Sequence, residues 1–170
     1  MPNDAQAASM SVLATSLYNL NHDVFIDTNT GYLIEKFSAF NEDFTVKDTL
    51  GRYDWKLSAE KKIINNLEAF KATSSKTVIN SKGSFEFPIE AWYVPELPYN
   101  TGPADFEGLP GLIVEVKVKS NIGYILRLKN IQEVTSLDIA KPDDKGMISQ
   151  EEYNDEIKKL TKKTKEFFKN

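Results

Sequence analysis

The stretch that decides the fold is residues 91–113, AWYVPELPYNTGPADFEGLPGLI. It combines four prolines with three glycines. Proline fixes φ, whereas glycine reaches backbone conformations that other residues avoid. A long connection stiffened in this way is predicted to be an ordered crossing rather than a flexible linker. The simpler interpretation is a rigid cover over one end of a sheet, and the alternative is a recognition surface, because ordered loops often carry binding.

If this loop recognises a partner or a ligand, its aromatic, proline, glycine and leucine positions are the candidate contact residues. The predicted set is Trp92, Tyr93, Pro95, Pro98, Gly102, Pro103, Phe106, Gly108, Leu109, Pro110 and Gly111. Four bulky side chains are expected to pack the loop against the domain, namely Tyr93, Tyr99, Phe106 and Leu109.

Alternating hydrophobicity predicts strands on both sides of the loop. Leu112 to Lys119 and Ile122 to Lys129 each alternate apolar with polar residues, so they are expected to form an antiparallel hairpin with one buried face. Gln132 to Ile139 can add a third strand. Before the loop, Ser84 to Val94 alternates in the same way, and Pro88 inside it predicts a sheet edge or a bulge because proline lacks a ladder donor.

The first half of the chain also consists of short apolar runs separated by turn residues. Val24 to Ile26 and Tyr32 to Phe40 flank the turn-forming Asp27 to Gly31 and predict a hairpin. Further strands are predicted at Phe44 to Val46 and at Leu67 to Val78. Between them the pattern is ambiguous, because Ser58 could instead cap a short helix.

These elements indicate an α+β, mainly β fold. We expect a curved antiparallel sheet of about six to eight strands, covered by a C-terminal helix and by the Pro/Gly-rich loop. The helix is predicted at residues 149–169, where Ser149 is a good N-cap and the last turns are rich in lysine. Residues 1–10 are expected to be a flexible tail, and residues 11–170 a single domain.

Composition excludes several classes of protein. The chain of 170 residues has a net charge of −4, which disfavours a nucleic-acid binder. It has no cysteine, so disulfides, thiolate catalysis and cysteine metal sites are ruled out. No apolar run approaches the roughly 20 residues of a membrane helix, so we do not expect a membrane-spanning protein. The first ten residues lack the features of a signal peptide.

Three candidate catalytic or metal sites are rejected. Residues 141–152 imitate a calcium loop, but lysines occupy its first and fifth positions, where ligands are needed. His22 is the only histidine and has no recognisable nucleophile beside it. Glu86 and Glu90 would lie about 13 Å apart on one strand, too far for a glycosidase pair. No catalytic residue, metal or cofactor is therefore predicted.

The loop and its surroundings resemble the GLPGLI proteins, which are known by a motif that stands intact here from Gly108 to Ile113. Ala91 to Pro98, Asp54 to Leu57 and Lys71-Ala72 are also similar to the family pattern. The resemblance implies a Bacteroidetes protein exported to the periplasm or cell envelope. The family's biochemical function is not established, so it transfers no catalytic residue. Many members carry a cysteine near the position of Ala69, which is absent here.

Three functions stay open at this point. The first is a non-enzymatic envelope module that binds an unknown envelope protein through the loop or has a structural role. The second is a carrier that holds an apolar ligand or lipid between sheet and helix, which requires a lined cavity. The third is a hydrolase, which requires several convergent polar side chains in one cleft.

Overall fold

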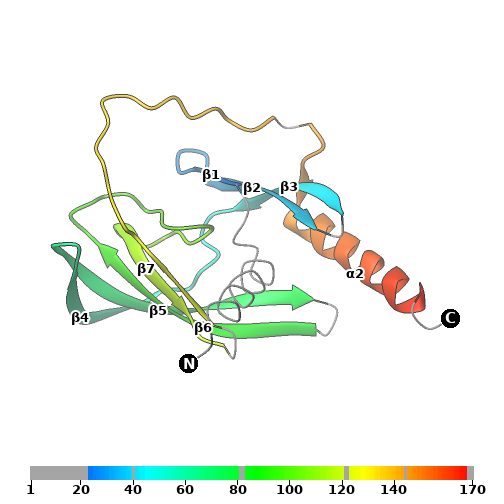
Figure 1. The fold of residues 1–170 in the computed structure, drawn as a ribbon, viewed down its shortest axis with the longest axis horizontal. Coiled ribbons are helices and arrows are strands. Elements are labelled where there is room, and N and C mark those ends of the chain that lie inside the picture. Colours follow the sequence, from blue (N-terminus) through cyan, green and yellow to red (C-terminus); the bar gives the residue numbers. More distant parts are fainter. Residues whose placement is uncertain (1–22, 40, 81–82, 121–122, 144, 168–170) are drawn as a thin grey trace, which may run out of the picture.

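The computed structural model describes residues 23–39, 41–80, 83–120, 123–143 and 145–167 (Figure 1). The described residues form nine strands and one helix, and the strands divide between two sheets. In chain order the elements are β1 (Asp23–Asp27), β2 (Tyr32–Ala39), β3 (Glu42–Thr49), β4 (Lys56–Ile64), β5 (Leu67–Asn80), β6 (Gly83–Val94), β7 (Leu112–Val118), β8 (Tyr124–Arg127), β9 (Ile148–Ser149) and α2 (Gln150–Phe167).

The smaller sheet has the strand order β1-β2-β3-β9. Its first hairpin turns at Asp27, whose side-chain oxygen accepts hydrogen bonds from the backbone N–H groups of Asn29 and Thr30. β9 pairs in parallel with β3 through Val46 and Ile148, which attaches the start of α2 to this sheet. Leu33, Ile34 and Val46 are buried within it. The predicted hairpin and the strand around Phe44 to Val46 are both confirmed.

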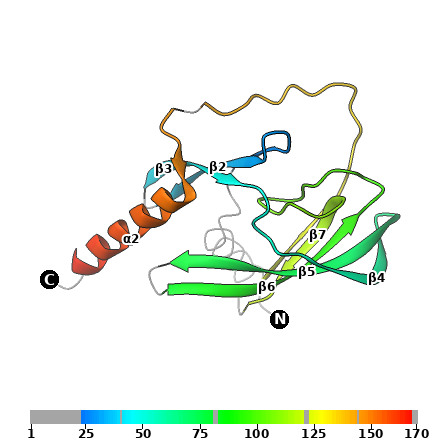
Figure 2. The same ribbon diagram turned by 180° about the vertical axis from the view of Figure 1, so that it is seen from behind.

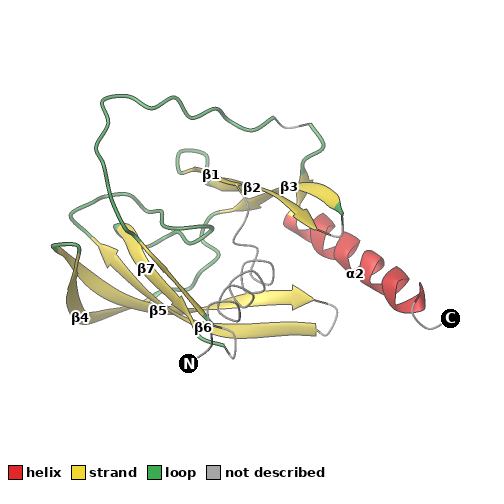
Figure 3. Ribbon diagram, in the orientation of Figure 1, coloured by secondary structure: helices red, strands yellow, loops and turns green. Residues whose placement is uncertain are grey.

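The larger sheet is antiparallel and has the order β4-β5-β6-β7-β8 (Figure 3). Asn65 and Asn66, both with positive φ, make the two-residue turn from β4 to β5, a conformation that asparagine tolerates better than most residues. The predicted hairpin after the loop is present as β7 and β8. Pro88 lies one residue beyond the last β6–β7 pair, so its missing N–H breaks no bond of that ladder.

Each face of the larger sheet buries its own cluster. The first cluster lies beneath the Pro/Gly-rich loop and includes Tyr93, Phe106 and Val116. The second lies on the opposite face and includes Ala69, Trp92 and Val114. Side chains alternate between faces along a strand, which explains why the neighbours Trp92 and Tyr93 belong to different clusters.

The helix packs mainly on the smaller sheet and also touches β5 of the larger one. Tyr153 of α2 packs edge-on against Phe37 and Phe44, with ring centroids 5.2 and 5.1 Å apart. From there α2 extends away from the body of the protein (Figures 1 and 2). Among the described residues, no helix combines the length and hydropathy that crossing a membrane requires.

The mainly β class and the ordered loop are confirmed, but the strands form two sheets instead of the single sheet that was expected. One local prediction is wrong, because Gln132 to Ile139 form no strand. The ambiguous region after Ser58 continues strand β4. The tail at residues 1–10 and His22 lie outside the described residues.

Candidate functional site

The loop between β6 and β7 is held in one shape by its own backbone. The N–H of Gly108 donates to the carbonyl of Asn100 at 2.9 Å. The N–H groups of Leu112 and Ile113 donate to Leu97 and Thr101 at 2.8 and 3.0 Å. These bonds cross the loop instead of following it, so they fold it into a compact crossing, as the sequence predicted.

Two glycines let the loop approach the sheet. A Cβ atom at Gly111 would lie 2.3 Å from the carbonyl oxygen of Val94, and one at Gly102 would lie 2.6 Å from the Cβ of Ile113. Both distances are too short for a side chain. The loop therefore needs glycine for close contact at these two positions.

Gly111 provides a direct test of this contact. Gly111→Ala is expected to lower the free energy of unfolding by about 1–3 kcal/mol, because backbone must move to admit the new methyl group. Urea denaturation would measure it. Gly146→Ala is the matched control, since Gly146 also has positive φ but nothing lies within 4 Å of its Cβ position. A loss no larger for Gly111→Ala than for the control would contradict the packing argument.

Two bulky loop side chains anchor the crossing in the first cluster. Phe106 and Leu109 are both 0% exposed. The ring of Tyr53 stacks on Phe106 with centroids 5.3 Å apart. The indole Nε1 of Trp55 donates to the carbonyl of Glu107 at 2.8 Å. The segment before β4 thus clamps the loop from one side.

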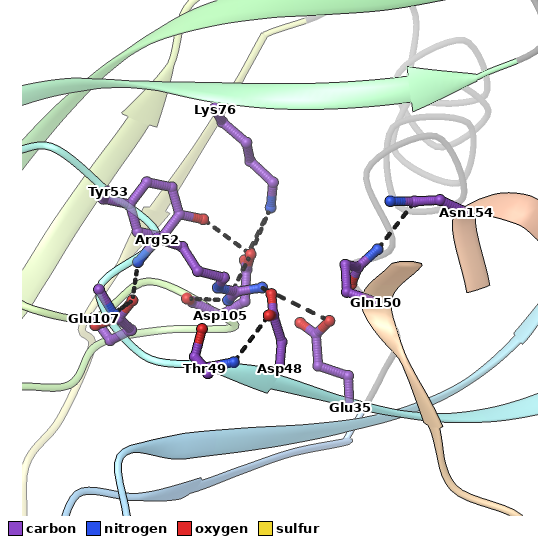
Figure 4. A network of polar contacts seen from close by, with 11 residues as sticks. Glu35, Asp48, Thr49, Arg52, Tyr53, Lys76, Asp105, Glu107, Gln150 and Asn154 are labelled. Atoms are coloured by element: carbon purple, nitrogen blue, oxygen red, sulfur yellow. Dashed lines mark hydrogen bonds and ion pairs between the residues drawn. The ribbon is translucent and has the colours of Figure 1, made fainter. Parts of the chain in front are cut away.

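Beside Phe106, the carboxylate of Asp105 is the centre of a buried polar cluster (Figure 4). The Nζ of Lys76 lies 2.9 Å from each of its oxygens. The hydroxyl of Tyr53 donates to Oδ2 at 2.9 Å, and the Nη2 of Arg52 lies 3.3 Å from the same oxygen. Burial by itself would raise the pKa of Asp105, but the nearby cations of Lys76 and Arg52 outweigh it and lower that pKa to about 2.

Arg52 extends this cluster to the smaller sheet. Its Nη1 lies 3.7 Å from Asp48 of β3 and 4.0 Å from Glu35 of β2. Burial and the neighbouring charge of Asp105 raise the pKa of Glu35, despite the opposing effect of Arg52. The Nε of Arg52 is buried without a hydrogen-bond partner among the described residues. Arg52 therefore links the smaller sheet to the loop, and Lys76 of β5 links the larger sheet to it.

Glu107 makes a second connection between the loop and the segment before β4. Its Oε1 accepts hydrogen bonds from the backbone N–H groups of Gly51 and Arg52 at 3.0 and 3.2 Å. With Asp105, it brings two acidic side chains of one loop onto one neighbouring segment. Asp105 is paired with cations and Glu107 accepts backbone hydrogen bonds, so both acidic side chains fix the loop to its neighbours.

The structure divides the predicted contact residues by burial. Five lie in the protein interior, namely Trp92, Tyr93, Phe106, Leu109 and Gly111. Trp92 lies on the sheet face opposite to the loop, with the Nζ of Lys62 4.1 Å above its ring. Gly102 and Pro103 are half-buried, and the exposed positions are Pro95, Pro98, Gly108 and Pro110.

One exposed aromatic residue belongs with these prolines. Tyr99 was expected to pack inward, yet it is 59% exposed. The exposed loop surface is therefore defined as Pro95, Glu96, Pro98, Tyr99, Asn100, Gly108 and Pro110. It combines three prolines with one large aromatic side chain.

An open groove of about 670 Å³ lies between β3 and the first turns of α2. Its lining is mostly charged or polar, consisting of Tyr32, Lys47, Asp48, Thr49, Ser149, Gln150, Glu151, Asn154, Asp155 and Lys158. Gln150 and Asn154 face this region and hydrogen-bond to each other at 3.1 Å (Figure 4). The groove is open to solvent, whereas a lipid carrier requires an enclosed cavity.

Sequence reasoning missed the buried polar cluster altogether. The available signal was the placement of Asp105 and Glu107 on either side of Phe106, because acidic residues beside a buried aromatic require partners. Those partners, Arg52 and Lys76, lie 53 and 29 residues away in the chain.

Comparisons with known proteins support the loop as the distinctive part of the chain. A model of a family described as a protein of unknown function (Porph_ging) matches residues 80–115, which include β6 and the loop. No curated protein matches the sequence.

A solved structure, that of PNGF-II in space group C2, shares the fold. It superposes with a TM-score of 0.53 at 21% identity, over 78% of this chain and 24% of the other. The chain thus spans about a quarter of the length of that protein.

Proposed function

We propose that this chain is a non-enzymatic recognition module of the GLPGLI type, which binds an envelope protein through the exposed loop surface. The observation that carries the proposal is the set of contacts on Asp105, in which Lys76, Arg52 and Tyr53 fix the loop in place. A loop fixed before binding loses little conformational entropy when a partner arrives. The rigidity is therefore useful to a binding surface.

The composition of the exposed loop surface supports this role. Tyr99 offers a large contact area with few rotatable bonds, and tyrosine is enriched at protein interfaces. Pro95, Pro98 and Pro110 fix the backbone around it. We expect Tyr99 to be the central contact and the prolines to set the shape of the exposed loop surface.

The buried polar cluster is less suited to catalysis. A carboxylate with a pKa of about 2 is a weak base, and Asp105 is already contacted by two cations and a hydroxyl. Glu35 has a raised pKa, which is a feature of some general acids, but its side chain is buried and lies against Arg52. The hydrolase alternative would require a substrate to reach Glu35.

The likeness to part of PNGF-II supports a modular role. In that structure the shared fold accounts for 24% of a longer chain, so the fold occurs there beside other parts of a larger protein. We propose that this chain likewise works beside a partner, in the periplasm or cell envelope. The absence of cysteine is compatible with that compartment.

Tyr99→Ala tests the proposal. The protein is immobilised and exposed to an envelope extract of its own host, and captured proteins are quantified by mass spectrometry. Loss of a central aromatic contact typically costs about 2 kcal/mol or more, so capture of the specific partner should fall at least about tenfold. The melting temperature should not change, because the side chain is largely in solvent.

Ile63→Ala is the matched control. Ile63 is 66% exposed and lies on β4, outside the exposed loop surface. It should capture the same proteins as the unaltered chain. Equal capture by Tyr99→Ala and the unaltered chain would contradict the proposal.

A further inference from the structure

The connection from β8 to β9 contains a segment that is rich in β-branched residues but pairs with no strand among the described residues. The exposed segment is defined as residues 131–139, IQEVTSLDI, which arch from one sheet to the other (Figure 1). Four of its side chains are large, apolar and between 48% and 70% exposed: Ile131, Val134, Leu137 and Ile139. Soluble proteins seldom leave so many such side chains in water within a short stretch.

Strand β8 is the matching feature, because it forms an edge of the larger sheet. The N–H of Leu128 donates to Val114 of β7 at 2.8 Å, which sets the alternation of the strand. By that alternation the N–H and C=O groups of Ile125 and Arg127 point away from β7, toward the open edge of the sheet. In the described part of the chain no strand pairs with that side of β8. An edge of this kind readily accepts another strand.

Charge is complementary between the two features. The exposed segment contains Glu133 and Asp138 and no basic residue. Residues 124–129, which comprise β8 and its flank, contain Arg127 and Lys129 and no acidic residue. Strand β1, an edge of the smaller sheet, carries two aspartates and no basic residue, so it would repel the acidic segment. Charge therefore favours β8 over β1 as the receiving edge, although β4, the other edge of the larger sheet, is also basic.

We infer that the exposed segment of one copy adds as a strand to the β8 edge of a second copy. The exchange is reciprocal, so that a two-fold dimer gains two added strands and leaves neither β8 edge open. In its own chain the segment leaves β8 and runs toward β9, which pairs with the other sheet. Pairing with a second copy would satisfy its backbone and could bury the three apolar side chains that share one face of the added strand, Ile131, Leu137 and Ile139.

Cross-linking between single-cysteine variants tests the exchange, and the natural chain offers no competing thiol. Ile125→Cys and Val134→Cys are made as two separate proteins; both positions are more than half exposed, so folding should be unaffected. The two are mixed and treated with a short flexible bis-maleimide. We expect a cross-linked heterodimer in the mixture, and a dimer by sedimentation of the unaltered chain.

Two results would overturn the inference. One is a monomer at every soluble concentration, with no cross-linked heterodimer. The other is a cross-link within one chain when Ile125→Cys and Val134→Cys are combined, because that would show the segment folding back on its own β8. Mixing Ile125→Cys with Ile63→Cys controls for random collision.

A second variant separates strand addition from general stickiness. Leu137→Lys places a charge on the exposed segment at a position that is 70% exposed in the single chain. It should weaken dimerisation at least about tenfold, because it removes a leucine that the inferred dimer would bury. Ile63→Lys, at a comparably exposed position, should leave dimerisation unchanged. Equal weakening by both variants would contradict the assigned interface.

Discussion

Replacing Asp105 with Ala is expected to lower the free energy of unfolding by about 3 kcal/mol, the lower end of the cost of breaking a buried ion pair. The carboxylate is 7% exposed, and its removal leaves Lys76 and Arg52 without their shared counter-ion. The loss of stability should lie at this lower end because the side chains of Lys76 and Arg52 keep 18% and 20% exposure and stay partly hydrated. Urea denaturation with far-UV circular dichroism would measure the change.

Two further variants show whether the effect belongs to the buried cluster. Lys61→Met breaks the pair with Glu68, whose partners are 57% and 42% exposed, and should change stability by less than about 1 kcal/mol. Combining Asp105→Leu with Lys76→Met removes both charges and should recover part of the loss. A cost for Asp105→Ala as small as that for Lys61→Met would refute the role assigned to the cluster.

The same carboxylate predicts how stability depends on pH. Its pKa in the folded protein is about 2, below the usual value of 3.8. A lowered pKa stabilises the fold fully above the unfolded value, and this contribution of roughly 2 kcal/mol disappears as the pH falls through the folded value. The stability advantage of the unaltered chain over Asp105→Asn should therefore shrink between pH 3.8 and pH 2. An advantage that does not change over that interval would contradict the assigned pKa.

Phe106→Ala is the second change with a large expected effect. Phe106 is fully buried, stacks on Tyr53 and lies between the loop and the larger sheet. Removing a buried phenylalanine typically costs about 3–5 kcal/mol through lost burial and a residual cavity. We expect unfolding at lower urea concentration, together with faster amide hydrogen exchange throughout the loop.

Tyr99→Ala serves as the control within the same loop. Since Tyr99 is 59% exposed, its loss should change stability by no more than about 0.5 kcal/mol. The pair of variants thus separates the two roles of the loop, with Phe106 holding it and Tyr99 available for contact. Similar stability losses in both variants would show that this division is wrong.

Sequence patterns predicted the strands better than their assembly. The alternation in Leu112 to Val118 is a local property and marked β7 correctly. The distribution of strands between two sheets depends on long-range pairing, such as that of Val46 with Ile148, which no local pattern records. Residues 132–139 have the composition of a strand but no partner within the described chain, so composition alone was misleading.

The loop was predictable in its rigidity but not in its orientation. Its prolines and glycines indicated an ordered crossing, and the backbone bonds confirm one. Which side chains point outward depends on where the loop meets the sheet, so Phe106 and Tyr99 could not be told apart from their spacing. The partners of Asp105 come from β5 and from the segment before β4, and only the tertiary fold brings these together.

The parallel pair of β3 and β9 has a consequence for the order of assembly. Val46 pairs with Ile148, which lies 102 positions later in the chain. The smaller sheet has its fourth strand only when this pair forms. During synthesis the first three strands emerge long before β9 does. Contacts of such high sequence separation form slowly, so completion of this sheet should be a late event in folding.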